Sequence, residues 1–136
     1  MKLRQGKTKA TLHSSIDSAL LAVEVYNKPR TVFRSEAYIT LMVMAWTRLF
    51  HAYFNHKGVK YFEKDKQGRF LRIDDEGRTV TIGGEFRTWG LRDCIKNFKE
   101  LDLAVKDNLK FFIGLRNKIE HRHIDKREVD VLIFGE

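Results

Sequence analysis

The stretch that decides the fold is S-E-A-Y-I-T-L-M-V-M-A-W-T-R-L-F-H-A-Y-F, residues 35–54. Apolar side chains recur in it at helical spacing on nearly every side. A helix that is apolar nearly all round is usually the central, buried one. We therefore predict a central helix over about residues 35–54. Its polar residues fall on one stripe, which consists of Thr47, Arg48, His51 and Asn55.

A second helix is predicted upstream of this stretch. Ser14 or Ser15 fits its N-cap, and an apolar row then recurs at helical spacing. The helix should stop at Asn27-Lys28-Pro29, because Pro disfavours helical geometry in the residue before it. Residues 1–12 are basic and polar, and we expect them to form a loose arm. The apolar row consists of Ile16, Leu20, Val23 and Tyr26.

Downstream, the pattern changes to short β-prone runs over residues 59–63, 69–73 and 79–82. The turn signals Asp65-Lys66-Gln67-Gly68 and Asp75-Glu76-Gly77 separate them. We predict a small three-stranded antiparallel meander over about residues 59–82, which Gly83-Gly84 ends.

Helical spacing then returns twice. A short helix carries Leu91, Ile95 and Phe98, and Cys94 shares its apolar face as a small core residue. A long helix is predicted over about residues 102–121, while the tail, residues 124–136, fits either a strand or a short helical turn. The buried stripe of the long helix should be Val105, Leu109, Phe112, Leu115 and Ile119.

These elements predict a mainly α protein: one domain over residues 1–136, built as a helical bundle with an inserted meander. The formal charge of +8 suits a polyanionic partner such as RNA, DNA or an anionic surface, although it could equally serve solubility. The single cysteine excludes an internal disulfide and suits a reducing cytoplasm. No run of residues has the length and apolarity of a membrane span or a secretory signal. The histidines form no convincing metal set, so neither a metal nor another cofactor is expected.

The segment Arg116-Asn117-Lys118-Ile119-Glu120-His121 carries the most chemistry. Asn117 and His121 are four residues apart and stack on one helix face, and Arg116 and Glu120 stack on the neighbouring face. Both pairs are predicted to flank the buried stripe. A cation, an amide, an imidazole and a carboxylate are thus crowded into two helical turns.

This set of groups fits RNA cleavage by the RNA's own 2′-hydroxyl. That reaction needs a base for the hydroxyl, an acid for the 5′-oxygen and positive charge for the phosphorane. His121 titrates near neutral pH, Arg116 presents a fixed fork of donors to phosphate, and Asn117 can orient either. Two structural alternatives stay open: an ordinary i,i+4 ion pair between Arg116 and Glu120, and a helix-capping role for His121.

The segment Arg116–His121 resembles the Arg-polar-x3-His motif of the HEPN superfamily (higher eukaryotes and prokaryotes nucleotide-binding). The segment Ala22-Val23-Glu24-Val25-Tyr26-Asn27-Lys28-Pro29, followed by Phe33-Arg34, resembles an uncharacterised bacterial branch of HEPN-like proteins found in toxin or phage-defence settings. Together the resemblances cover about residues 14–123.

The resemblance implies a helical bundle that dimerises, so that two such segments meet in one composite RNase site. Arg116, Asn117 and His121 match the catalytic positions. Glu24, Arg34 and Glu120 are possible supporting residues, and so is His123, which stands where some family toxins carry a modifiable Tyr. The implied partners are RNA, a second copy of the chain and an antitoxin or regulatory protein. Two other functions stay open: a catalytically silent module that binds nucleotide, RNA or protein, and a plain dimerisation domain.

Overall fold

The computed structural model describes residues 6–28 and 34–121, and the last of these by its backbone alone. In these residues it contains four helices: α1 (Lys7–Asn27), α2 (Arg34–Lys57), α3 (Leu91–Asn97) and α4 (Leu103–His121). Three short strands lie between α2 and α3: β1 (Arg72–Ile73), β2 (Thr79–Val80) and β3 (Glu85–Phe86). The predicted class, mainly α with a small antiparallel sheet, is confirmed.

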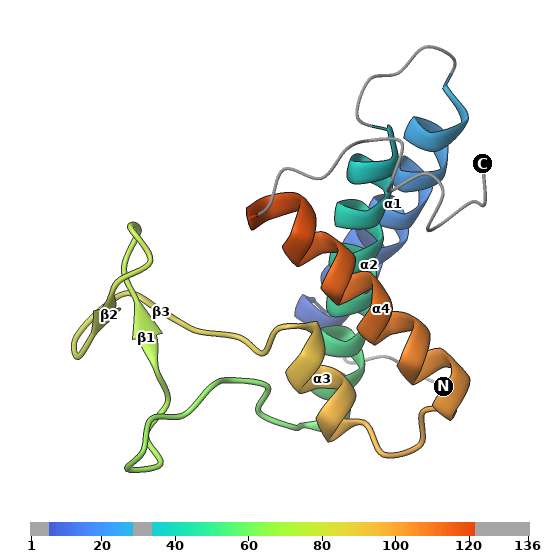
Figure 1. Ribbon diagram of the computed structural model, residues 1–136. Helices are drawn as coiled ribbons and strands as arrows, with labels where there is room; N and C mark the ends of the chain where they lie inside the picture. Colours follow the sequence, from blue (N-terminus) through green and yellow to red (C-terminus); the bar gives the residue numbers. More distant parts are fainter. Residues whose placement is uncertain (1–5, 29–33, 122–136) are drawn as a thin grey trace.

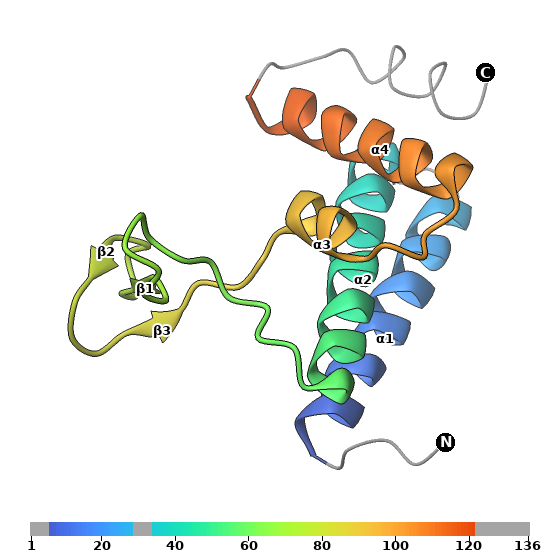
Figure 2. The same ribbon diagram turned by 90° about the horizontal axis from the view of Figure 1, so that it is seen from below.

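Helix α2 is the central element, as its apolar pattern predicts. It lies between α1 on one side and α3 and α4 on the other, and α4 crosses its N-terminal part (Figures 1 and 2). No helix in residues 6–28 and 34–121 is long and apolar enough to span a membrane. The buried core joins α2, α3 and α4 and contains, among others, Ile39, Val43, Phe50, Phe54, Leu91, Ile95, Leu109, Ile113 and Leu115.

Helix α1 starts earlier than predicted and packs through a different face. Residues 7–12, expected in a loose arm, form its first turns, and Ser15, expected as an N-cap, lies buried in its middle. The apolar row that marks the helix in the sequence is exposed: Leu20 is 63% and Val23 is 50% accessible. The buried face instead consists of small residues, namely Thr8, Ser15, Ser18 and Ala22.

The reason lies in what α2 presents to α1, namely the Ala45 carbonyl and two residues of its polar stripe, Arg48 and Asn55. The Ser15 hydroxyl donates to the Ala45 carbonyl oxygen at 2.6 Å. Arg48 Nη1 donates to the Ser18 hydroxyl at 2.8 Å. Asn55 Nδ2 donates to the hydroxyl of Thr8 at 2.6 Å. Small side chains let the helices approach closely and their hydroxyls satisfy these polar groups, because a buried polar group without a partner is costly.

The sheet keeps the predicted number of strands and both turns, but not the predicted pairing. Asp65 and Asp74 each accept two backbone N–H groups across their turns, as the turn signals suggest. The strand order is β2-β1-β3. The third strand, β3, comes after Gly83-Gly84, where the meander was predicted to end. Gly84 has a φ of 69°, and a Cβ there would collide with the Ile73 carbonyl oxygen. Residues 59–63 form no strand: Phe62 makes an isolated bridge with Thr88, and the Glu63 carbonyl oxygen accepts the Leu71 N–H.

Cys94 lies on the core face of α3, as predicted, and should resist alkylation in the folded protein. Its side chain is fully buried, and burial raises the pKa of its thiol to about 12. Since the thiolate is the reactive form, iodoacetamide should label native Cys94 more than about 100-fold more slowly than Cys94 in urea-unfolded chain. Mass spectrometry of timed samples measures both rates, and equal rates would contradict the burial of this thiol.

Candidate active site

Arg116 lies on the core-facing side of α4, not beside the buried stripe as the sequence suggested. Its position follows Phe112 by one helical turn, and its side chain is 34% exposed. The Nε atom is buried and has no hydrogen-bond acceptor among the described residues. Glu120 Oε1 is 3.8 Å from it, which is close enough for ionic attraction but too long for a hydrogen bond. Because the Nε atom is buried, only the exposed part of the guanidinium can reach an anion.

Asn117 is exposed on the outer side of α4, and residue 121 follows one turn later. On an ideal helix, positions 117 and 121 share a face, whereas positions 116 and 121 point about 140° apart. The structure thus places Arg116 and Asn117 on one short segment but on different faces of it. The side chain of His121 and the whole of His123 lie outside the described residues.

The proposed supporting residues at the α1–α2 end are not joined to this segment. Glu24 is exposed on α1, where it lines a shallow hollow with Leu20 and Asn27. The Arg34 guanidinium stacks over the ring of Tyr26 at 5.1 Å. Within the described residues, neither Glu24 nor Arg34 forms a hydrogen bond or ion pair with α4. Of the supporting residues that the structure describes, only Glu120 lies beside Arg116.

Comparison with known families adds one relation. Residues 10–136 match the family described as Domain of unknown function (DUF3644). The chain belongs to the DUF3644 family. No curated protein and no solved structure matches it.

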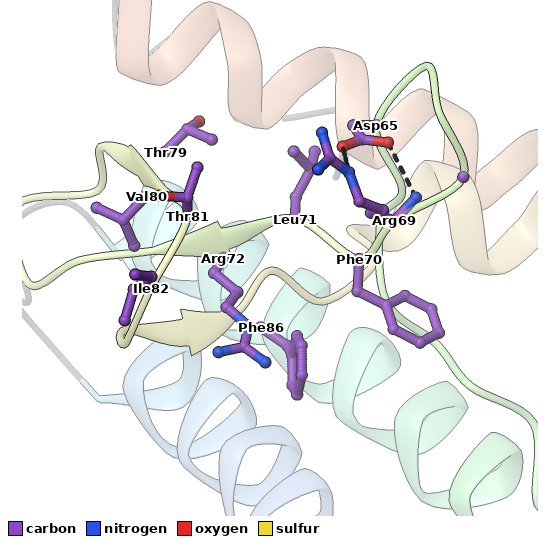
Figure 3. Close-up of a pocket in the computed structure, with 11 residues that line it drawn as sticks. Asp65, Arg69, Phe70, Leu71, Arg72, Thr79, Val80, Thr81, Ile82 and Phe86 are labelled. Atoms are coloured by element: carbon purple, nitrogen blue, oxygen red, sulfur yellow. Dashed lines mark hydrogen bonds and ion pairs between the residues drawn. The ribbon is translucent and has the colours of Figure 1, made fainter.

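The sheet of this DUF3644 member projects from the bundle (Figure 1). It carries a second candidate binding surface. A hollow of about 520 Å³ lies on it (Figure 3). The Arg72 guanidinium stacks over the Phe86 ring at 4.8 Å, and Arg69 pairs with Asp65 at 3.2 Å. Two arginines close to an aromatic residue, Arg69 and Arg72 with Phe70, carry this signal in the sequence, and the prediction from the sequence missed it. Because Arg69, Arg78 and Arg87 all pair with carboxylates, much of the sheet's positive charge is already neutralised.

Arg48 and His51, on the polar stripe of α2, both make structural contacts. His51 Nε2 is 2.7 Å from the Trp89 carbonyl oxygen, and its ring stacks on Tyr61 at 4.6 Å. Since Tyr61 and Trp89 stand at the two ends of the meander, this contact fixes the meander's base to the bundle. No cluster of three or more potential metal ligands occurs in the described parts of the chain.

Protonation of His51 should destabilise the protein. Burial lowers the pKa of His51 from its ordinary value, and nearby Lys7 lowers it further, while the hydrogen bond to Trp89 opposes them. As pH falls below about 6.5, the unfolded chain takes up a proton that native His51 resists. The urea midpoint should therefore decrease as the pH is lowered from 7.5 to 5.5. This group should change the free energy of unfolding by at most about 1.4 kcal/mol per pH unit.

Two variants isolate that contribution. His51→Gln keeps a donor for the Trp89 carbonyl but cannot titrate, so its stability should depend less on pH. His13→Gln, at an exposed position of α1, should keep the wild-type slope. An unchanged slope in His51→Gln would contradict the burial-lowered pKa.

Proposed function

We propose that this protein is a metal-independent endoribonuclease whose reaction centre is formed by Arg116, Asn117 and His121 of α4. The observation that carries the proposal is the half-buried Arg116, whose guanidinium forms no hydrogen bond within the described residues and whose side chain stays 34% exposed. A phosphate oxygen is the acceptor that fits a guanidinium best, since charge-assisted bonds to it are short and can be bidentate. The resemblance to HEPN motifs supports the same assignment.

The proposed reaction is an internal transesterification. His121 of one copy takes the proton of the 2′-hydroxyl, and the 2′-oxygen forms a bond to phosphorus. The bond from phosphorus to the 5′-oxygen breaks, and a second His121 gives that oxygen a proton. Arg116 stabilises the charge of the phosphorane, and Asn117 orients the imidazole or the phosphate. The products are a 2′,3′-cyclic phosphate and a 5′-hydroxyl, and DNA cannot react because it lacks the nucleophile.

A homodimer is part of this proposal because one helix cannot aim both groups at one phosphate. Positions 116 and 121 diverge by about 140° around α4, so one copy points Arg116 and His121 apart. Two antiparallel α4 segments would supply an acid and a base from opposite subunits. The toxin or defence role, an antitoxin or regulatory partner and a cytoplasmic location are further parts of the proposal, and they rest on the HEPN resemblance.

A second candidate is a catalytically silent module that binds nucleotide, RNA or a partner protein. The contact between Arg116 and Glu120 at 3.8 Å favours it, because that pair already gives the guanidinium a counter-charge. A partly exposed i,i+4 pair of this kind contributes only a few tenths of a kcal/mol. The ion pair alone therefore adds too little stability to explain an arginine at a core-facing position.

Cleavage of single-stranded RNA by the purified chain in EDTA tests the proposal. The proposed enzyme yields 2′,3′-cyclic phosphate ends and leaves DNA of the same sequence intact. Binding of RNA without cleavage would support the silent module instead. Cleavage that requires Mg²⁺ would contradict the proposed chemistry.

A further inference from the structure

Four of the five residues that line a hollow between α3 and α4 are basic. Its volume is about 370 Å³, and Ile95 is its one uncharged lining residue. Arg92 and Lys96 reach it from α3, and Lys106 and Lys110 reach it from α4. Each helix thus contributes two cations spaced four residues apart.

This arrangement places like charges together without counter-charges. Like charges at i,i+4 on a helix repel, and here two such pairs face each other. None of the four cations forms a hydrogen bond or ion pair with any residue in the described parts of the chain. The ion pairs found there occupy the sheet and the C-terminal part of α4. Asp93 and Asp107 belong to the same helices but do not line the hollow.

A bound anion would relieve the repulsion among the four cations. The start of α4 adds little to the positive potential. Asp102 immediately precedes the helix, and its carbonyl oxygen accepts the Lys106 N–H, so an acidic residue stands at the N-terminus.

The outer face of α4 connects this hollow to the proposed reaction centre. Lys106, Lys110, Gly114, Asn117 and residue 121 fall within about 80° of one another around the helix axis. Residue 121 lies about 16 Å beyond Lys110 along that axis. Gly114 lies between them, and a Cβ built there would meet no atom within 4 Å. Among the described residues, no atom of another element lies against Gly114 between the hollow and the motif.

We propose that the α3–α4 hollow binds the phosphate backbone of single-stranded nucleic acid and guides the strand along α4 toward residue 121. The binding step stands on the four cations alone, whereas the direction of the strand rests on the proposed function. Lysines act as flexible point charges, and no aromatic side chain lines the hollow. It therefore recognises phosphates rather than bases.

The test measures binding with a probe that cannot be cleaved. A fluorescein-labelled single-stranded DNA oligonucleotide is titrated with the full-length chain at several salt concentrations, and anisotropy reports binding. Two variants remove the same charge: Lys106→Gln/Lys110→Gln in the hollow, and Lys9→Gln/Lys57→Gln at exposed positions of α1 and α2. Circular dichroism checks that both keep the wild-type helical signal.

The hollow variant should lose two phosphate contacts. Each contact contributes about 0.7 to the slope of log affinity against log salt for single strands, so the slope should flatten by about 1.4. At about 0.1 M salt the affinity should fall about 25-fold, while the control variant stays near wild type. The thermal midpoint of the hollow variant should be equal to or above that of wild type, because the repulsion among the cations is relieved.

Three outcomes would overturn the inference: no binding by the wild-type chain, equal affinity in the hollow variant, or an equal loss in the control. Competition by an acidic peptide as strong as that by unlabelled oligonucleotide would point to a protein partner and also overturn it. Loss of binding in the hollow variant of a chain that cleaves no RNA would uphold the inference while the proposed function fails. RNA cleavage by the wild-type chain, together with unchanged oligonucleotide binding by the hollow variant, would uphold the proposed function and overturn the inference.

Discussion

RNA cleavage should fall by about 10²–10⁴-fold when His121 is replaced by Ala, because that is what a positioned general acid or base contributes. Arg116→Ala should cost about 10²–10³-fold through the lost stabilisation of phosphorane charge. Both rates are measured on a labelled single-stranded RNA in EDTA. Lys118→Ala, at an exposed position of the same turn, is the matched control and should keep wild-type activity.

Arg116→Lys separates catalysis from a structural role of Arg116. Lysine keeps a charge for Glu120 but loses the planar fork that binds phosphate oxygens. Catalysis predicts a large loss of cleavage at unchanged stability, whereas a structural pair predicts little change in either. Cleavage that survives both His121→Ala and Arg116→Ala would falsify the proposed site and point to a contaminating nuclease.

The composite site adds an expectation for mixed subunits. When His121→Ala chain is co-expressed in excess, most wild-type chains enter mixed dimers that lack one of the two imidazoles. Activity per wild-type chain should then decrease as the share of variant increases. Activity that stays proportional to the wild-type chain would contradict a shared site while leaving Arg116 and His121 as candidates within one copy.

Ser15→Leu should destabilise the fold by about 2–4 kcal/mol, although it adds an apolar side chain to a helix. Ser15 is 6% exposed, and its hydroxyl donates to the Ala45 carbonyl oxygen. Leucine would remove that bond and force α1 away from α2. The free energy of unfolding in urea, followed by circular dichroism, measures the effect.

The neighbouring residue provides the control. Ile16 is 49% exposed, so Ile16→Ser should cost less than about 1 kcal/mol. If Ile16→Ser proved more damaging than Ser15→Leu, α1 would have to pack through its apolar row.

The helices are the part of the fold that the sequence predicts best. The bounds of α2 and α4 follow closely from the apolar pattern, because each carries one uninterrupted pattern that its packing uses. In α1 the row that reveals the helix is not the row that packs. A signal was present, since Thr8, Ser15 and Ala22 recur every seven residues as small side chains, which is the spacing of a close helical seam.

Pairing across the chain was harder to predict. The turns at Asp65 and Asp74 are local and were found, whereas β3 depends on Gly84 passing close to Ile73, a contact between distant residues. The candidate site divides in the same way. Helical arithmetic places Arg116 and Asn117 on α4, but the burial of Arg116 Nε and the meeting of cations from α3 and α4 require the packed helices.

The two ends of the meander meet, because the Trp89 N–H donates to the Tyr61 carbonyl oxygen at 2.9 Å. Everything between these residues leaves the bundle and returns to the same point (Figure 1). Insertions are tolerated best where entry and exit lie together. The region between Tyr61 and Trp89 can therefore lengthen, shorten or diverge during evolution with little effect on the packing of the helices.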